Sequence, residues 1–135
     1  MTRKEERTVA FTLVFEKMFN TESSIEELVE NAAEADSLEV SAFSKMLAAT
    51  VFEHIDDIDS LIDEFAVGWK KERIPKVSLA VMRLAICEML YVDSIPVSVS
   101  INEAVELAKT FATSDDAAYI NGILGSAAKR INNEL

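Results

Sequence analysis

Three cations near the N-terminus are the first residues of this chain whose types and spacing point to chemistry. Arg3 and Arg7 are four residues apart, and Lys4 follows Arg3 directly. Residues four apart lie on one face of a helix, so this spacing places three cations at one helix end, where they are able to contact the phosphates or stack on the bases of RNA. Glu5 and Glu6 dilute the positive charge, and by itself the pattern favours a solvated helix end of mixed charge.

Catalytic and metal-binding residues have little support in the sequence. His54 is the only histidine and Cys87 the only cysteine, which argues against a metal cluster, a Cys/His nucleophile and an intrachain disulfide. We expect His54 to face solvent or to be locally hydrogen-bonded, and Cys87 to be a small buried residue. Asp56, Asp57 and Asp59 are not followed by an EF-hand loop and predict a solvated helix face. No catalytic site, metal or cofactor is expected.

Helices must position these residues, because apolar side chains recur at helical spacing and only three glycines and two prolines are available for turns. The pattern predicts an all-α fold of about seven helices. Thr2 with Glu5, and Ser24 with Glu27, have the spacing of a capping box at a helix start. The first expected helix carries the apolar stripe 11–18, and the second begins at 24. The next three span 40–53, 55–65 and 76–92. The sixth is capped by Ser98 or Ser100 and runs to 112, and the last begins at 113.

The fifth expected helix, 76–92, is apolar nearly all round, which predicts an element surrounded by other helices. It carries Arg83 and Glu88 and is too short for a comfortable membrane span. Gly68 is expected to end the preceding helix, and Pro75 is expected in the first turn of this one. In the third helix, the residues expected to face inward are Phe43, Met46, Leu47, Thr50 and Val51.

Length and charge limit the classes of function. The 135 residues suit one domain that spans 1–135, without the apolar core of a signal peptide, and the single cysteine is compatible with a reducing cytoplasm. The net charge is −11, and residues 21–64 alone hold thirteen acidic side chains and one basic. Nucleic-acid binding relies on cations, so RNA is expected only on another face. The acidic segment is otherwise expected to keep the protein in solution.

Two local features depart from the regular helical pattern. Residues 69–73, Trp-Lys-Lys-Glu-Arg, form a second basic and aromatic cluster at a helix junction, where Trp69 is expected to cover the core. Gly122 interrupts the last helix at a cost of about 1 kcal/mol relative to alanine. A cost of this kind predicts a close backbone approach or a functional surface.

The stretch from Ile95 to Leu124 identifies a family. It contains Ile95-Pro96, then Ile-Asn-Glu-Ala-Val-Glu-Leu-Ala-Lys at 101–109, and Tyr-Ile-Asn-Gly-Ile-Leu at 119–124. Before it stand Arg73-Ile74 and Val-Met-Arg-Leu-Ala-Ile-Cys-Glu-Met at 81–89. In this order and spacing the motifs resemble the NusB family of transcription antitermination factors, and the resemblance covers nearly the entire chain.

The resemblance implies an all-helical protein of two packed helical subbundles. It implies a cytoplasmic bacterial factor that binds the boxA segment of nascent ribosomal RNA transcripts together with NusE, a small-subunit ribosomal protein. This pair joins an RNA polymerase complex that resists premature termination. No catalysis is implied, because the mechanism is cooperative assembly in which each ligand raises the apparent affinity of the others.

The resemblance also assigns residues. The cations at 3, 4 and 7 match the arginine-rich N-terminus of the family, while Asp115 and Tyr119 stand at positions that resemble RNA-influencing acidic and aromatic residues. Tyr119 is expected either to stack on an exposed base or to be half-buried against the first helix. Asn121 is expected to hydrogen-bond RNA or to cap local backbone.

For the NusE partner, the resemblance points to Phe15, Glu72, Ser78 and Arg83. Ser78 replaces an acidic residue that the family uses against basic NusE, so Glu72 is expected to carry more of that role. Two alternatives stay open. One is a helical protein-interaction or self-associating module, such as a homodimer, with little intrinsic RNA binding. The other is the N-terminal module of an RNA cytosine methyltransferase, against which the chain length counts.

Overall fold

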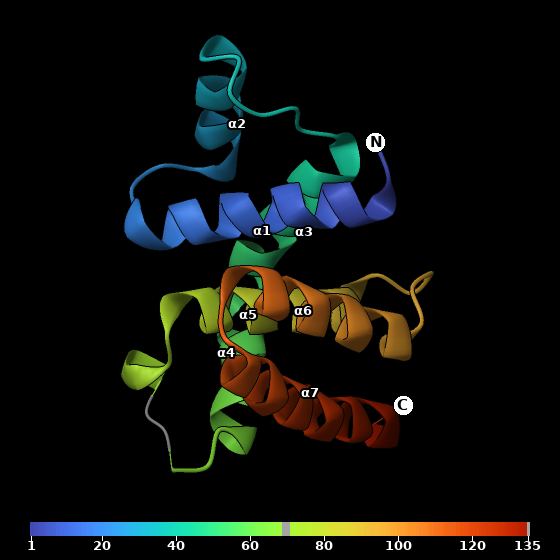
Figure 1. Ribbon diagram of the computed structural model, residues 1–135. Helices are drawn as coiled ribbons and strands as arrows, with labels where there is room; N and C mark the ends of the chain where they lie inside the picture. Colours follow the sequence, from blue (N-terminus) through green and yellow to red (C-terminus); the bar gives the residue numbers. More distant parts are fainter. Residues whose placement is uncertain (69–70, 135) are drawn as a thin grey trace.

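Helices make up nearly all of the computed structural model, which describes residues 1–68 and 71–134 (Figure 1). The all-α prediction is confirmed: this part of the chain contains no strand. In chain order the elements are α1 (Arg3–Phe19), α2 (Ile25–Glu34), α3 (Ala42–Glu53), α4 (Ile55–Phe65), the short 3₁₀ helix η1 (Lys71–Arg73), α5 (Lys76–Tyr91), α6 (Val97–Phe111) and α7 (Ser114–Glu134).

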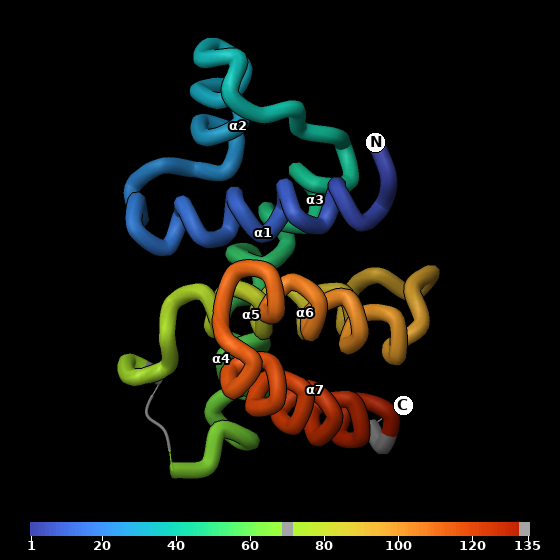
Figure 2. The backbone as a smooth tube through the Cα atoms, in the orientation of Figure 1, coloured from blue at the N-terminus to red at the C-terminus, as the bar shows by residue number. Residues whose placement is uncertain are grey.

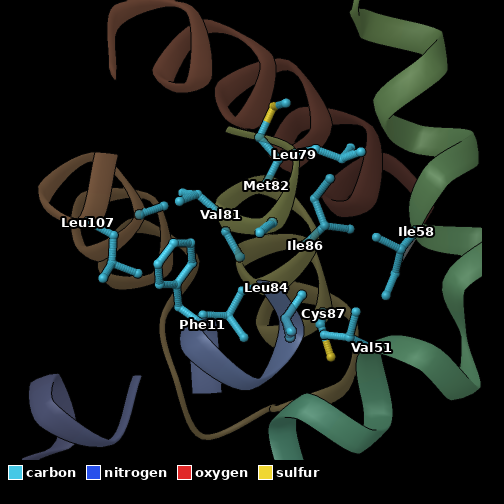
Figure 3. Packing of buried hydrophobic residues seen from close by; sticks show 14 of the residues in the cluster. Phe11, Val51, Ile58, Leu79, Val81, Met82, Leu84, Ile86, Cys87 and Leu107 are labelled. Carbon is cyan, nitrogen blue, oxygen red and sulfur yellow. The ribbon is translucent and has the colours of Figure 1, made fainter. Parts of the chain in front are cut away.

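Helix α5 is the central element, as its apolar sequence predicts. It packs against α1, α3, α4, α6 and α7, and eleven consecutive or nearly consecutive positions from Ser78 to Met89 are buried. Burial on every side is possible because apolar side chains occupy all faces of the helix. Figure 3 shows its core side chains surrounded by residues of four other helices: Phe11, Val51, Ile58 and Leu107.

The helices form two groups that meet at α5, in agreement with the two subbundles implied by the resemblance. Helices α1, α2 and α3 contact one another, and α4, α6 and α7 pack with α5 on the other side. Figures 1 and 2 show α1 above α6, with α7 on the far side of α6 and α2 projecting away from the body. This arrangement brings the N-terminal cations of α1 to one flank of α6, and α7 to the other.

Side-chain caps begin several helices where the sequence predicts them. Thr2 accepts a hydrogen bond from the backbone of Glu5 at the start of α1. At α2 the capping box of Ser24 and Glu27 is complete in both directions. Each cap satisfies backbone N–H groups that have no partner within the helix, which explains why these starts are readable from sequence.

Several expected boundaries and orientations are wrong. Helix α3 begins at Ala42 after the cap Ser41, and Met46 is 43% exposed instead of facing inward. Pro75 lies just before α5, outside its first turn. Helix α6 begins directly after Pro96, so neither expected serine caps it, and Ser100 is buried instead. Proline holds φ near the helical value, so it starts these helices without a side-chain cap.

Glycines have two different roles here. Gly68 has a φ of +84°, in the left-handed region that favours glycine, and it follows the end of α4 at Phe65. The close backbone approach expected at Gly122 is absent from the described structure, since a Cβ built there meets no atom within 4 Å. Trp69 and Lys70 of the basic and aromatic cluster lie outside the described residues.

Candidate nucleic-acid and protein interfaces

Arg3 and Lys4 reach the surface at the start of α1, as predicted. The Arg3 guanidinium lies 3.7 Å from the centroid of the Phe43 ring and is 3.4 Å from a Glu6 carboxylate oxygen. Its side chain keeps 52% exposure, so a phosphate can still approach it. Lys4 is exposed and makes no side-chain hydrogen bond or ion pair within the described residues. These two residues are the accessible N-terminal cations.

Arg7 is in the core, which corrects its expected place on an exposed cationic surface. Its Nε donates to both carboxylate oxygens of Glu88 on α5, at 3.0 and 3.1 Å. The side chains of Arg7 and Glu88 are only 6% and 2% exposed. Ser100 of α6 donates from its hydroxyl to the same carboxylate at 3.1 Å. One buried network therefore joins α1, α5 and α6.

The sequence contained a signal for this role. Arg7 precedes Ala10, Phe11 and Val14 by three, four and seven residues, so it continues the buried stripe of α1. A charge at such a position must find a partner of opposite charge, because an isolated buried ion is very costly. The four-residue spacing between Arg3 and Arg7 shows that they share a helix face, but it does not show whether other helices cover that face.

Asp115 and Tyr119 come together at the start of α7. With Arg73, Ile74 and Pro75 they line a cavity of about 260 Å³ between the N-terminal ends of α5 and α7. Asp115 is exposed and Tyr119 half-buried. Burial raises the pKa of the Tyr119 phenol, which keeps it neutral at physiological pH. Tyr119 is thus half-buried as one of the two expectations had it, but its ring lines a cavity at the start of α5 and not a surface of the first helix.

Asn121 lies in a different cavity from Asp115 and Tyr119. It is exposed and, with Asn102 and Lys109, lines a groove of about 390 Å³ between α6 and α7. Glu106 of α6 lines this groove and also the cavity beside Lys4 on the opposite flank of the helix. Apart from Arg3, the predicted RNA residues therefore line three cavities, two of which share α6.

Aromatic rings follow one another along α1 and continue to the end of α6. Phe15 is half-buried, and its ring centroid lies 6.0 Å from that of Phe11 and 5.0 Å from that of Phe19. Phe111, at the end of α6, stacks on Phe11 at 5.1 Å. Phe19 is 64% exposed and Phe111 45% exposed. We call Phe15, Phe19 and Phe111 the aromatic strip. The predicted partner residue Phe15 belongs to it.

Glu72 and Arg83 share a cavity of about 370 Å³ between α1, α3, α4 and α5. Arg83 donates from Nε and Nη2 to the two carboxylate oxygens of Asp59 at 2.9 and 2.8 Å. Lys17 lines the same cavity, where its ammonium donates to the Ser23 carbonyl at 2.7 Å. Apolar side chains also line the cavity, so this region combines an apolar surface with two cations, Lys17 and Arg83, that already have partners.

Ser78 is fully buried, which corrects its expected position on the partner surface. It does not line the cavity that holds Glu72 and Arg83. Its hydroxyl has no hydrogen-bond partner among the described residues. A serine at this position of α5 is therefore part of the packing, and contact with a partner must come from its neighbours.

Comparison with known proteins agrees with the motifs and the fold. A family model described as the NusB family matches residues 4–129. This chain belongs to the NusB family. The transcription antitermination protein NusB of Natranaerobius thermophilus is 38% identical over 136 residues, which cover 98% of each chain. That of Acetivibrio thermocellus is 40% identical over 131 residues, covering 96% of this chain and 90% of the relative.

Solved NusB structures share the whole fold. T. maritima NusB superimposes with a TM-score of 0.82 at 29% identity, covering all of this chain and 99% of that one. A chain in the crystal structure of the antitermination factors NusB and NusE in complex with dsRNA has a TM-score of 0.82 and 25% identity, covering 95% of this chain and 96% of that chain.

In this NusB-family chain the signature stretch contributes to the packing of α6 against α7, which contact each other extensively. Fewer than half of its apolar residues are buried, and most of the others are half-buried. The buried members are Ala104, Leu107, Ala108, Ala117, Ile120, Ile123 and Leu124. The pattern that identifies the NusB family therefore reports packing, and the polar residues between these positions form the groove surfaces.

His54 and Cys87, the single histidine and the single cysteine, pack within the fold. His54 stacks on Tyr91 with ring centroids 4.1 Å apart. Cys87 is buried as predicted, and desolvation together with the nearby carboxylates of Glu88 and Glu53 raises the pKa of its thiol to about 12. Among the described residues no group of three or more histidine, cysteine, aspartate or glutamate side chains is placed to hold a metal ion. None of the described helices is long and apolar enough to span a membrane.

Proposed function

We propose that this NusB-family protein is a transcription antitermination factor that binds boxA-type RNA of nascent ribosomal RNA transcripts together with NusE. The observation that supports this most strongly is the likeness, over nearly the whole chain, to NusB in a NusB–NusE–dsRNA complex. The protein acts in the cytoplasm as one domain, residues 1–135, and joins the RNA polymerase antitermination complex. It works by assembly, without catalysis or a cofactor.

The RNA surface in this proposal runs over the start of α1, the flanks of α6 and the start of α7. Arg3 and Lys4 supply the phosphate contacts, because the charge of Arg7 is neutralised by Glu88. Tyr119 offers an aromatic ring for stacking, and Asn121 an amide for hydrogen bonding. With only two accessible cations at the N-terminus, intrinsic RNA affinity is weak and depends on NusE.

The NusE surface in this proposal joins Phe15 and Phe19 of the aromatic strip to the cavity that holds Glu72 and Arg83. Aromatic rings are favoured at protein interfaces because they bury a large area with few rotatable bonds. The exposed carboxylate of Glu72 lies at the rim, where it can meet a basic partner. Arg83 acts through Asp59, which holds its guanidinium in place.

Quantitative RNA binding with and without NusE tests the function. We expect boxA-type RNA to bind more tightly when NusE is present. When Lys4 is changed to glutamine, the slope of the logarithm of the binding constant against the logarithm of the salt concentration should decrease in magnitude by about 0.7. Lys45→Gln on α3 is the matched control, since it removes one exposed cation from the acidic segment. If boxA-type RNA is not preferred over a scrambled RNA even with NusE, the function is wrong.

Exposure of the aromatic strip supports a second candidate function, a self-associating interaction module with little RNA binding. Phe19 and Phe111 place apolar rings in solvent on the same side of the molecule. Light scattering after size-exclusion chromatography distinguishes the two functions. A homodimer that dissociates when Phe19 is changed to serine favours self-association, whereas a monomer at all concentrations excludes it.

A further inference from the structure

The cavity between α1 and α6 has a lining unlike that of a phosphate site. It has a volume of about 210 Å³ and is bordered by Lys4 and Arg7 of α1 and by Glu103, Glu106 and Phe111 of α6. Two cations thus face two carboxylates across a small space with an aromatic ring at one end. The carboxylates disfavour a bare phosphate, and the cations disfavour a lysine or arginine of a partner.

Glu103 has bonding capacity to spare. Its carboxylate is half-buried, yet it makes no hydrogen bond or ion pair with any residue that the structure describes. A partly buried carboxylate normally accepts hydrogen bonds from nearby donors. Glu106, by contrast, is exposed and lies 3.6 Å from the ammonium of Lys109. The Glu103 carboxylate, whose oxygens are not among the fully buried ones, is therefore free to accept hydrogen bonds from a ligand in the cavity.

Arg7 supplies donors on the opposite wall. Its hydrogen bonds to Glu88 use Nε alone, and within the described part of the chain its terminal amino groups make none. Glu88 holds the guanidinium in one orientation, and its carboxylate is itself held by a hydrogen bond from the Ser100 hydroxyl. Arg7 thus has N–H groups left for a ligand in the cavity that it lines.

Phe111 gives the cavity a flat apolar side. Its ring packs against Phe11 and remains 45% exposed. Aromatic side chains of this kind stack on the unpaired bases of single-stranded RNA. A planar neutral ligand fits this cavity if one edge donates to Glu103, another edge accepts from Arg7, and its flat face stacks on Phe111.

We propose that this cavity is a subsite for one unpaired guanine base of the bound RNA. Guanine presents adjacent N–H donors on its Watson–Crick edge, which match the carboxylate of Glu103. On its other edge it presents the O6 and N7 acceptors that arginine recognises, which match Arg7. Phe111 stacks on the ring. This inference rests on the proposed RNA-binding function and gives the carboxylates of α6 a role in base selection.

Binding of short RNAs to the full chain with NusE tests the subsite. The probes are uridine-rich single strands that carry one central guanosine, inosine or adenosine, measured by fluorescence anisotropy. We expect the guanosine strand to bind about tenfold more tightly than the adenosine strand, as for a bidentate base contact. Inosine lacks the exocyclic amino group and should bind between the two.

Glu103→Gln is the decisive variant, because it replaces an acceptor pair by one acceptor and one donor without a change of size. It should reduce the guanosine preference to less than about twofold, while Phe111→Leu weakens all three strands. Glu30→Gln on α2, which removes an exposed carboxylate far from the cavity, should change nothing. A preference that survives Glu103→Gln overturns the subsite but leaves RNA binding intact. If no strand binds, the subsite fails, whereas the proposed function fails only if boxA-type RNA also does not bind in the presence of NusE.

Discussion

Replacement of Arg7 by methionine should destabilise the protein far more than replacement of a surface cation. The guanidinium is 6% exposed and its partner Glu88 is 2% exposed, with Nε 3.0 and 3.1 Å from the two carboxylate oxygens. Methionine keeps much of the length of the side chain but removes the charge. It leaves the Glu88 carboxylate buried beside Ser100 without a cation.

The expected loss is about 3–5 kcal/mol in the free energy of unfolding, the cost of removing one partner of a buried ion pair. A second change, Glu88→Met, removes the stranded charge. Because apolar replacements of a whole buried pair are often neutral or stabilising, the double variant should recover most of the loss. In the double variant the Ser100 hydroxyl has lost its acceptor, so adding Ser100→Ala should recover the part of the stability loss that this unpartnered hydroxyl causes.

Urea denaturation followed by circular dichroism measures these differences. Domains of this kind usually have an unfolding free energy of about 5–15 kcal/mol, so the single variant should still fold at low temperature with a lower midpoint. Lys4→Met is the matched control on the same helix and should change stability by less than about 0.5 kcal/mol. An Arg7→Met loss below about 1 kcal/mol, or a double variant no better than the single one, would refute the reasoning.

Three further changes test other features of the core and surface. Gly122→Ala should raise the unfolding free energy by about 0.5–1 kcal/mol, because the new Cβ meets no atom within 4 Å. If the variant also loses affinity for RNA or NusE, a ligand approaches this glycine. Ser78→Ala should stabilise the protein by about 1 kcal/mol, because the buried hydroxyl has no partner among the described residues, and NusE affinity measured beside it should stay within about twofold. Cys87, with its pKa raised from 9.0 to about 12, should resist thiol reagents in the folded state at pH 8. Because the unfolded thiol ionises first, stability should fall as pH rises above 9, and Cys87→Ala should remove that part of the decline.

Local signals account for the parts of the fold that the sequence predicted well. The caps at Thr2 and Ser24 act within a few residues, so their effect does not depend on distant parts of the chain. The apolar run of α5 predicts burial on all sides wherever the helix lies. The start of α3 differs from the predicted residue 40, because Ser41 caps the helix and leaves Val40 outside it.

The candidate sites depended more on the tertiary structure. Asp115 and Tyr119 are four residues apart and share a cavity, as helical spacing allows, but the opposite wall comes from residues 73–75. Ser78 and Phe15 were both expected at a surface, yet only Phe15 contacts solvent. Which side of a helix other helices cover depends on packing between elements far apart in the chain.

The amino-acid sequence by itself determined that this protein is helical, that α5 is its centre, and that it belongs with the NusB proteins, because periodicity and motif order are properties of the chain. Only the tertiary structure decided what Arg7 does. Its partner Glu88 is 81 residues away, and an ion pair across that separation forms only when two helices pack. The same packing left Arg3 and Lys4 as the exposed cations and opened the cavity beside α6.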